Sequence, residues 1–221
     1  VMGVFDPLGL VSPALLQGKL LLRRLYGPEH LQWDTDLPAK EKEAWVSWLE
    51  ELLQETEIHM ERTVRPAGAV GCPVIAGFSD ASISAMCATI YVVWQMRETP
   101  PVSRLLLAKV RVTPASGFSV PRAELQAIVI MMRLLMVTLK AAAFKASRVV
   151  LATDSACCVA ALKKAGVSMN AFFANRVSEV RHTLEEAREL AEEVEDIRFI
   201  EGKQNPADWG TRPGRRLGEL G

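Results

Sequence analysis

Four carboxylates occupy points of the sequence where strands are expected to end or helices to begin. Asp80 follows the apolar run Val74–Phe78, and Asp154 follows the compact apolar run Arg148–Thr153. If these two runs form neighbouring strands, both acids lie at the carboxyl edge of the sheet, where open α/β sheets bind ligands. Two further acids stand near expected helix starts, Glu124 after Ser119-Val120-Pro121 and Asp208 after Asn205-Pro206.

Each of these acids has an ordinary structural explanation as a helix cap, a turn residue or a partner of a helix dipole. Together, however, clustered carboxylates beside apolar strands would repel one another and lose hydration unless a cation neutralised them. Hard oxygen ligands without His or Cys suit Mg²⁺ or Mn²⁺. Two such ions about 4 Å apart can orient a water and stabilise the leaving oxygen of a phosphodiester. The four acids therefore predict a metal site suited to phosphodiester hydrolysis.

The composition is that of a folded domain with an uneven charge distribution. The chain has 221 residues, 49 % of them hydrophobic, which excludes a wholly disordered or collagen-like protein. The 26 basic and 26 acidic side chains give a net charge of zero. Residues 71–152 nevertheless hold 9 basic and 3 acidic side chains, whereas residues 1–70 hold 7 and 11. The middle of the chain is therefore suited to a phosphate-bearing partner.

The first 65 residues read as mainly helical. Ser12-Pro13 predicts an N-cap and a first helical proline, and the helix is expected to run to about Tyr26. A second helix is expected after Pro38. Its apolar side chains recur at helical spacing and predict a face that packs against a neighbouring domain: Trp45, Trp48, Leu49, Leu52 and Leu53.

From about Gly71 the pattern changes to strands. Three runs with short separations predict an antiparallel meander: Val74–Phe78, Met86–Trp94 and Arg104–Val112. A helix from Ser119, the strand Arg148–Thr153, a short helix ending near Gly166 and a long helix over 170–194 follow. A last strand, Ile197–Ile200, precedes a terminal turn of helix from Asn205. We therefore predict the α/β class, with a mixed five-stranded sheet flanked by helices.

The cysteines and the apolar runs indicate in which cellular compartment the protein is expected. Cys72, Cys87, Cys157 and Cys158 form no C-x-x-C pair, which predicts free thiols in a reducing, intracellular setting rather than a zinc or disulfide framework. No apolar run approaches the roughly 20 residues that span a bilayer, so no membrane partner is expected. The start at Val1 lacks a basic region typical of signal peptides and predicts a fragment of a longer chain.

Five ordered motifs carry a family resemblance over nearly the whole chain. They are Phe5-Asp6-Pro7-Leu8-Gly9-Leu10-Val11-Ser12-Pro13, Gly77-Phe78-Ser79-Asp80-Ala81-Ser82, Pro121-Arg122-Ala123-Glu124-Leu125, Phe173-Ala174-Asn175-Arg176-Val177-Ser178-Glu179 and Asn205-Pro206-Ala207-Asp208-Trp209-Gly210-Thr211-Arg212. The sequence resembles BEL/Pao-type retrotransposon polyproteins. The resemblance implies a helical connection segment in residues 1–70, which follows a reverse transcriptase, and a ribonuclease H-like domain in residues 71–221.

The same resemblance implies an activity and its residues. The family cuts the RNA strand of an RNA/DNA hybrid with two Mg²⁺ ions, for which Mn²⁺ can substitute. Carried over by motif, the metal-binding and catalytic set is Asp80, Glu124, Asp154 and Asp208. The expected partners are the hybrid and the upstream reverse transcriptase, in the cytoplasm or within virus-like particles.

Contacts with the substrate are expected from basic and small polar side chains, because these hold phosphates and the 2′-OH without reading sequence. The candidates are Ser82, Arg122, Ser155, Asn175, Arg176, Lys203 and Arg212; Arg215 and Arg216 are equally well explained as solvated surface charge. Many ribonucleases H have a histidine in the loop before the last aspartate. Here the loop is Glu201-Gly202-Lys203-Gln204, and neither Lys203 nor Gln204 is a good proton shuttle near neutral pH, so we expect slow turnover.

Three other interpretations remain open from the residues. An integrase-like core would use Asp80, Asp154 and Glu189, which stands 35 residues after Asp154 but belongs to a run of seven acids. That interpretation leaves Glu124 and Asp208 without a role. An aspartic peptidase needs Asp-Thr/Ser-Gly, and both Asp154-Ser155-Ala156 and Asp80-Ala81-Ser82 lack the glycine. The third is a weakly active or silent copy that keeps the fold as a scaffold.

Overall fold

The structure is a computed structural model that describes residues 4–26, 31–32, 34–54, 61, 63–164 and 170–214. Predictions that fall outside these ranges concern the start at Val1, the expected helix end at Gly166, and Arg215 and Arg216 as candidate phosphate contacts. Within the described ranges, no helix has the length and apolar character needed to cross a bilayer.

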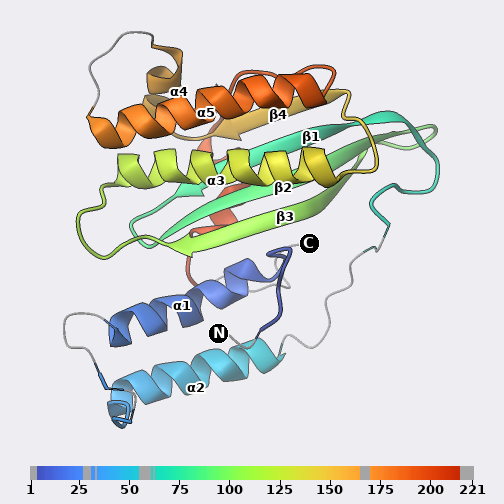
Figure 1. The fold of residues 1–221 in the computed structure, drawn as a ribbon. Coiled ribbons are helices and arrows are strands. Elements are labelled where there is room, and N and C mark those ends of the chain that lie inside the picture. Colours follow the sequence, from blue (N-terminus) through green and yellow to red (C-terminus); the bar gives the residue numbers. More distant parts are fainter. Residues whose placement is uncertain are drawn as a thin grey trace.

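Five strands form one mixed sheet in the order β3-β2-β1-β4-β5 (Figure 1). They are β1 (Ala69–Ala81), β2 (Ala85–Met96), β3 (Val102–Val112), β4 (Arg148–Thr153) and β5 (Arg198–Phe199). The first three pair as an antiparallel meander, whereas β4 runs parallel to β1 and β5 runs parallel to β4. The predicted mixed five-stranded sheet flanked by helices is therefore confirmed.

The main core lies between one face of the sheet and two long helices, α3 (Val120–Ala141) and α5 (Ala171–Leu190), which Figure 1 shows side by side over the strands. A close approach of α3 depends on Gly77 in β1. A Cβ at this position would lie 2.7 Å from Leu151 Cδ2 and 3.3 Å from Met131 Cγ. The short helix α4 (Ala156–Lys163) packs beside α5, beyond β4.

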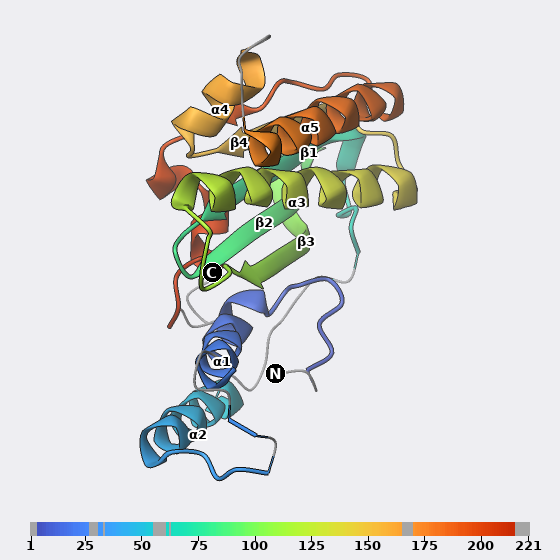
Figure 2. The ribbon, with the colours of Figure 1, turned by 60° about the vertical axis from the view of Figure 1, so that its left-hand side comes forward.

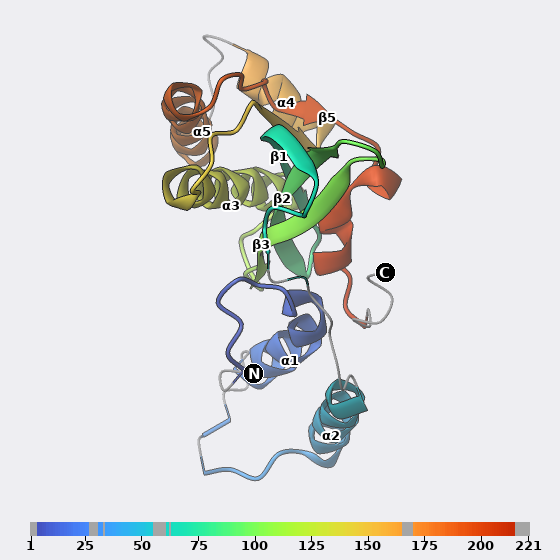
Figure 3. The same ribbon diagram turned by 90° about the vertical axis from the view of Figure 1, so that its right-hand side faces the viewer.

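A second core covers the opposite face, where Figure 3 shows the last helical turns of the chain across the sheet from α3 and α5. It is built from α1 (Ser12–Leu25) and the 3₁₀ turn η2 (Pro206–Gly210). Leu16 of α1 and Ala207 of η2 are fully buried there, against Cys87 and Val110 of the sheet. The division into residues 1–70 and 71–221 stays a prediction, but the two parts share this core.

The segment before α1 covers the free edge of β3. Ala108 N donates to Leu8 O at 2.7 Å, which extends the backbone pairing by one bond. Gly9 follows with a φ of 76°, and a Cβ there would overlap the Ala108 backbone, so only glycine permits this approach. The first of the five sequence motifs thus protects an edge strand from pairing with other chains.

The structure corrects two sequence-based details of the helical segment. Ser12 lies inside α1 and is not its N-cap; instead, Asp6 accepts from the Leu10 and Val11 backbone N–H groups at 2.8 and 3.2 Å. The apolar stripe of α2 (Ala39–Gln54) is only partly covered. Trp48 is buried and donates from Nε1 to Ala14 O at 3.0 Å, whereas Leu53 is 76 % exposed. Figure 2 shows the reason, since α2 contacts α1 and lies away from the sheet.

Candidate active site

The pairing of β1 with β4 brings the first two predicted acids together. The parallel register places Ser79 opposite Thr153, so the residues that follow, Asp80 and Asp154, leave neighbouring strands at the same edge. Asp80 is buried, with 7 % of its surface exposed, and Asp154 is half-buried. The sequence-based expectation that strand ends would unite these two acids is met in the backbone register.

Asn205 attaches η2 to both strand ends. Its Nδ2 donates to Ser79 O at 2.9 Å and to Asp154 Oδ1 at 3.3 Å, while its Oδ1 accepts from Ala207 N at 3.1 Å and caps η2. The side chain is almost fully buried. This one amide therefore fixes the 3₁₀ turn that carries Asp208 beside β1 and β4.

Thr211 makes a second link, to Asp80. Its hydroxyl donates to the Asp80 carboxylate and lies 3.0 Å from Asp208 O. Its own carbonyl accepts from Ser82 Oγ at 3.1 Å, and that serine also accepts from the Ala85 backbone N–H. Ser82, predicted as a substrate contact, is thus engaged in holding the β1–β2 turn against the end of η2.

The strand edge gathers negative charge around the buried Asp80. Burial raises the pKa of Asp80 to about 6, the charges of Asp154 and Asp208 add to the rise, and the hydrogen bond from Thr211 opposes it. The nearest cation is Arg212, whose Nε lies 2.6 Å from Asp208 Oδ2. The hydrogen bond and charge of Asp208, and to a smaller degree the charges of Asp80 and Asp154, raise the pKa of this guanidinium. Arg212, predicted as a substrate contact, is placed as a counter-ion of the three aspartates.

Glu124 lies beside this cluster but faces another group. Its Oε2 accepts from Ser155 Oγ at 2.8 Å and from Cys157 Sγ at 3.5 Å. Ser155 also caps α4, because its Oγ accepts from Cys158 N at 3.3 Å. Among the described residues, neither the four acids nor the three aspartates alone bring their ligand atoms within the 4.8 Å that unites Glu124 with Cys157 and Cys158. Ser155, another predicted substrate contact, is occupied in positioning Glu124.

The donor set of the three aspartates fits a hard divalent cation. All available side-chain ligands are carboxylate oxygens, and one of them belongs to a buried acid whose ionisation is opposed by burial and by its neighbours. Arg212 is exposed and pairs mainly with Asp208, so it leaves much of the charge on Asp80 and Asp154 unbalanced. Oxygen ligands of this kind are those that Mg²⁺ and Mn²⁺ prefer.

A basic and aromatic patch joins the beginnings of α3 and α5. The guanidinium of Arg176 lies 3.6 Å from the centre of the Phe172 ring, and that of Arg122 lies 5.2 Å from it. Arg176 Nε also donates to Gln126 Oε1 at 2.7 Å, and Arg122 donates to Gly117 O at 2.8 Å. The patch keeps two cations in place by stacking and hydrogen bonding.

The remaining predicted residues are spread around this edge. Asn175 is exposed on α5 beside Arg176, and Lys203 is exposed on the 3₁₀ turn η1 (Gly202–Gln204). Glu189, the third acid of the integrase-like interpretation, is exposed near the end of α5. The chain then returns to the beginning of β4, where Glu192 N donates to Ala146 O at 3.1 Å. Glu189 therefore lies near the opposite end of β4 from Asp154, which argues against an integrase-like site.

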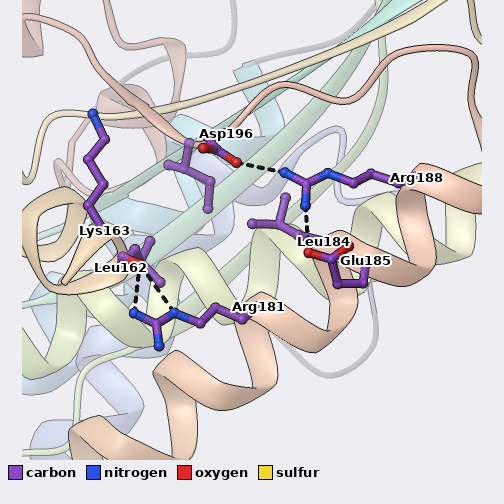
Figure 4. A pocket seen from close by; sticks show the side chains of 8 residues that line it. Leu162, Lys163, Arg181, Leu184, Glu185, Arg188 and Asp196 are labelled. Atoms are coloured by element: carbon purple, nitrogen blue, oxygen red, sulfur yellow. Dashed lines mark hydrogen bonds and ion pairs between the residues drawn. The ribbon is translucent and has the colours of Figure 1, made fainter. Parts of the chain in front are cut away.

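A pocket of about 250 Å³ between α4, α5 and the segment before β5 lies outside the predicted site (Figure 4). Arg181 donates to Leu162 O at 2.9 Å, and Arg188 bridges Glu185 at 2.5 Å and Asp196 at 2.8 Å. Figure 4 shows both guanidinium groups drawn toward these partners. These bonds tie α4 and the segment before β5 to α5, so the two arginines that line the pocket have structural roles.

Sequence reasoning assigned no role to Asn205, Thr211 or Cys157. Asn205 and Thr211 fall within the Asn205–Arg212 motif, and this motif was the sequence signal that could have indicated their roles. Cys157 had no such signal, because its neighbour Glu124 is distant in the sequence and comes close only through the packing of α4 on α3.

Gly210→Ala is expected to displace η2 and destabilise the protein by roughly 1–3 kcal/mol, as overpacked sites do. A Cβ on Gly210 would lie 2.9 Å from both Cys87 Cβ and Val110 Cγ2, and closer still to the Cys87 sulfur. Because η2 carries Asp208, this acid should move away from the ends of β1 and β4 as well. Urea unfolding of the variant beside the unmodified chain measures the effect. An unchanged free energy of unfolding would show that η2 is not seated on the sheet as described.

Ribonucleases H and a viral reverse transcriptase are among the solved structures that are similar to this chain. Curated proteins yield no match. Ribonuclease H1 from the archaeon Halobacterium salinarum is 11 % identical, with a TM-score of 0.39 over 62 % of this chain and 91 % of that chain. LC11-RNase H1, solved in complex with an RNA/DNA hybrid, is 16 % identical, with a TM-score of 0.37 over 62 % and 91 %. The prototype foamy virus protease-reverse transcriptase is 12 % identical, with a TM-score of 0.36 over 75 % of this chain and 25 % of that chain.

These structural similarities are distant, and the assignment rests on the sequence family. The model of the Pao retrotransposon-like RNaseH-like domain matches residues 1–155. The match includes Asp80, Glu124 and Asp154 and ends before Asp208. It confirms the resemblance to a retrotransposon ribonuclease H-like domain, and the first three of the five motifs lie within the matched residues. The chain belongs to the Pao retrotransposon-like RNaseH-like domain family.

Proposed function

We propose that this domain is an endonuclease that cleaves the RNA strand of RNA/DNA hybrids during reverse transcription. The observation that carries the proposal is that Asp80 and Asp154 leave β1 and β4 at the same edge of the sheet, where η2 brings Asp208 close enough for its charge to act on Asp80. Membership of an RNaseH-like family supports a nuclease relationship. The upstream reverse transcriptase of the same polyprotein is the proposed partner, in the cytoplasm or within virus-like particles.

In the proposed mechanism the three aspartates would hold Mg²⁺, with Mn²⁺ as a substitute, and Glu124 would join them by turning from Ser155 and Cys157. Bound divalent ions would supply an activated water and positive charge at the leaving oxygen of the phosphodiester. Asp80 offers a carboxylate whose hydration is already lost to burial, so its charge acts strongly on a cation. Asn205 and Thr211 orient Asp154 and Asp80, and Arg212 holds Asp208.

Binding of the hybrid is proposed to use the basic and aromatic patch. Arg122 and Arg176 present guanidinium groups fixed around Phe172, and Asn175 lies exposed beside them. Such groups position a nucleic-acid backbone without reading its sequence. Lys203, exposed on η1, is the proposed contact near the scissile phosphate in place of a histidine, which supports the expectation of slow turnover.

The test is incubation of the chain with a labelled RNA/DNA hybrid, duplex DNA and a protein substrate, each with and without Mg²⁺ or Mn²⁺. We expect cleavage of the RNA strand of the hybrid only when a divalent ion is present. An intact hybrid in Mn²⁺ would refute the proposal and favour the scaffold interpretation. Cleavage of duplex DNA alone would favour an integrase-like enzyme, and cleavage of the protein alone would favour a peptidase.

A further inference from the structure

Two thiols lie beside Glu124 at the beginning of α4. Cys157 is exposed and Cys158 is buried, and both are free. One carboxylate oxygen of Glu124 and the two sulfurs all lie within 4.8 Å of one another. The sequence contains no C-x-x-C pair, so this convergence of three metal-binding side chains exists only in the folded chain.

The elements that carry these donors are fixed to one another. Cys158 Sγ contacts Pro121 O at 3.8 Å, in the first turn of α3, which also carries Glu124. Ser155 Oγ lies between the two helix starts, 2.8 Å from Glu124 Oε2 and 3.3 Å from Cys157 Sγ. The donors therefore need only small side-chain adjustments to reach a common ion.

We propose that Glu124, Cys157 and Cys158 form a binding site for a thiophilic divalent cation of the Zn²⁺ class. Zn²⁺ binds cysteine sulfur at about 2.3 Å and carboxylate oxygen at about 2.0–2.2 Å, and three protein ligands leave a fourth position for water. The exposure of Cys157 gives an ion access from solvent. On binding, each thiol that becomes a ligand loses its proton to solvent.

The chemistry of the donors separates this site from the aspartate cluster. Thiolate ligands select soft or borderline metals, whereas Mg²⁺ prefers oxygen. The two sites share only Glu124, so an ion held by the thiols keeps this carboxylate from the aspartates. Zn²⁺ therefore inhibits hybrid cleavage by competing for Glu124; this consequence rests on the proposed function, whereas the binding itself does not.

The binding test uses Co²⁺ as a spectroscopic probe on the whole chain, reduced and freed of metal. We expect a sulfur-to-cobalt charge-transfer absorption that saturates near one ion per chain and disappears when Zn²⁺ is added. Cys157→Ser should weaken binding by roughly tenfold or more and reduce the absorption, since a ligand is removed. Cys72→Ser is the matched control, because Cys72 is an exposed thiol on β1. An absent absorption, or one that Cys157→Ser leaves unchanged, would overturn the proposal.

Further variants keep the test independent of folding and of catalysis. Cys158→Ser should also lose absorption, with circular dichroism to check its fold because Cys158 is buried. In Mg²⁺, Zn²⁺ should inhibit hybrid cleavage by the unmodified chain at concentrations roughly tenfold lower than for Cys157→Ser. If Zn²⁺ inhibits the unmodified chain and Cys157→Ser at equal concentrations, the proposed competition for Glu124 is refuted. A chain that cleaves no hybrid refutes the proposed function, while the Co²⁺ titration still decides the cation site.

Discussion

Asp80→Asn is expected to lower hybrid cleavage by at least about a thousandfold, which corresponds to about 4 kcal/mol of activation free energy. Asp80 is the most buried of the proposed metal ligands and the one on which the charges of Asp154 and Asp208 act. Asparagine keeps the size and can still receive the Thr211 hydrogen bond, but it carries no charge to hold a divalent ion. The measurement is initial cleavage rate in Mg²⁺ and in Mn²⁺. Wild-type rates for the variant would refute the assigned role.

The same substitution is expected to stabilise the metal-free protein at neutral pH. Because burial first and the neighbouring acids second raise the pKa of Asp80 from 3.8 to about 6, the folded state binds this proton more tightly than the unfolded state. The stabilising contribution is complete below the unfolded pKa and is lost as the pH rises through the folded one. Above about pH 6, ionised Asp80 therefore costs up to about 3 kcal/mol, which asparagine avoids.

Urea unfolding in the presence of a chelator, at several pH values from acid to neutral, tests whether Asp80→Asn raises the free energy of unfolding. The gain of Asp80→Asn over the unmodified chain should appear at neutral pH and vanish in acid. Asp36→Asn is the control, because Asp36 is an exposed aspartate before α2. Added Mg²⁺ should stabilise the unmodified chain and leave Asp80→Asn unchanged, since a ligand stabilises only the state that binds it. A variant less stable than the unmodified chain at neutral pH would contradict the argument.

Leu16→Ala is expected to destabilise the protein by roughly 2–5 kcal/mol, the cost of a cavity in a packed core. Leu16 is 0 % exposed and packs from α1 against the face of the sheet that η2 also covers. The matched control is Leu53→Ala, the same change at a side chain that is 76 % exposed on α2, with an expected effect within about 0.5 kcal/mol. Urea unfolding of both variants under one condition gives the comparison.

The outcome for this pair decides whether α1 is part of the folding unit. A large loss for Leu16→Ala alone means that a chain begun after residue 65 lacks the part of its second core that α1 supplies. Equal and small losses for both variants would mean that α1 only rests on the sheet.

The sequence predicted the structure best in segments with a regular spacing of apolar residues. Alternating and continuous apolar runs predicted five strands, and the ends of the first and fourth runs were expected to meet if these runs were neighbours, which the parallel pairing of β1 with β4 satisfies. Asp80 and Asp154 follow from these rules alone. The sequence placed Glu124 near the start of a helix, but a position on a helix does not determine the rotamer, and the carboxylate faces Ser155 and Cys157.

The less regular features needed the tertiary structure. The bond from Thr211 to Asp80 joins residues 131 positions apart, and it depends on η2 folding back across the sheet. The apolar spacing of α2 predicted a continuous buried face. How much of this face is buried depends on the extent of α1, the helix that packs on it. Trp48 is buried against α1, whereas Leu53 lies beyond this contact. Ser12 resembled an N-cap by type, but it lies inside α1, and the Asp6 carboxylate accepts from the backbone N–H groups of Leu10 and Val11 just before the helix.

The second core also constrains the order in which the chain can fold. Leu16 belongs to the first described helix and Ala207 to the last helical turn, yet both pack on the same strands. During synthesis, the β2–β3 surface that they cover stays open to water until nearly the whole segment has left the ribosome. Such distant contacts slow folding and leave apolar surface exposed to aggregation. A cut that separates α1 from η2 before they meet would leave that surface bare, so folding has to precede any such cut.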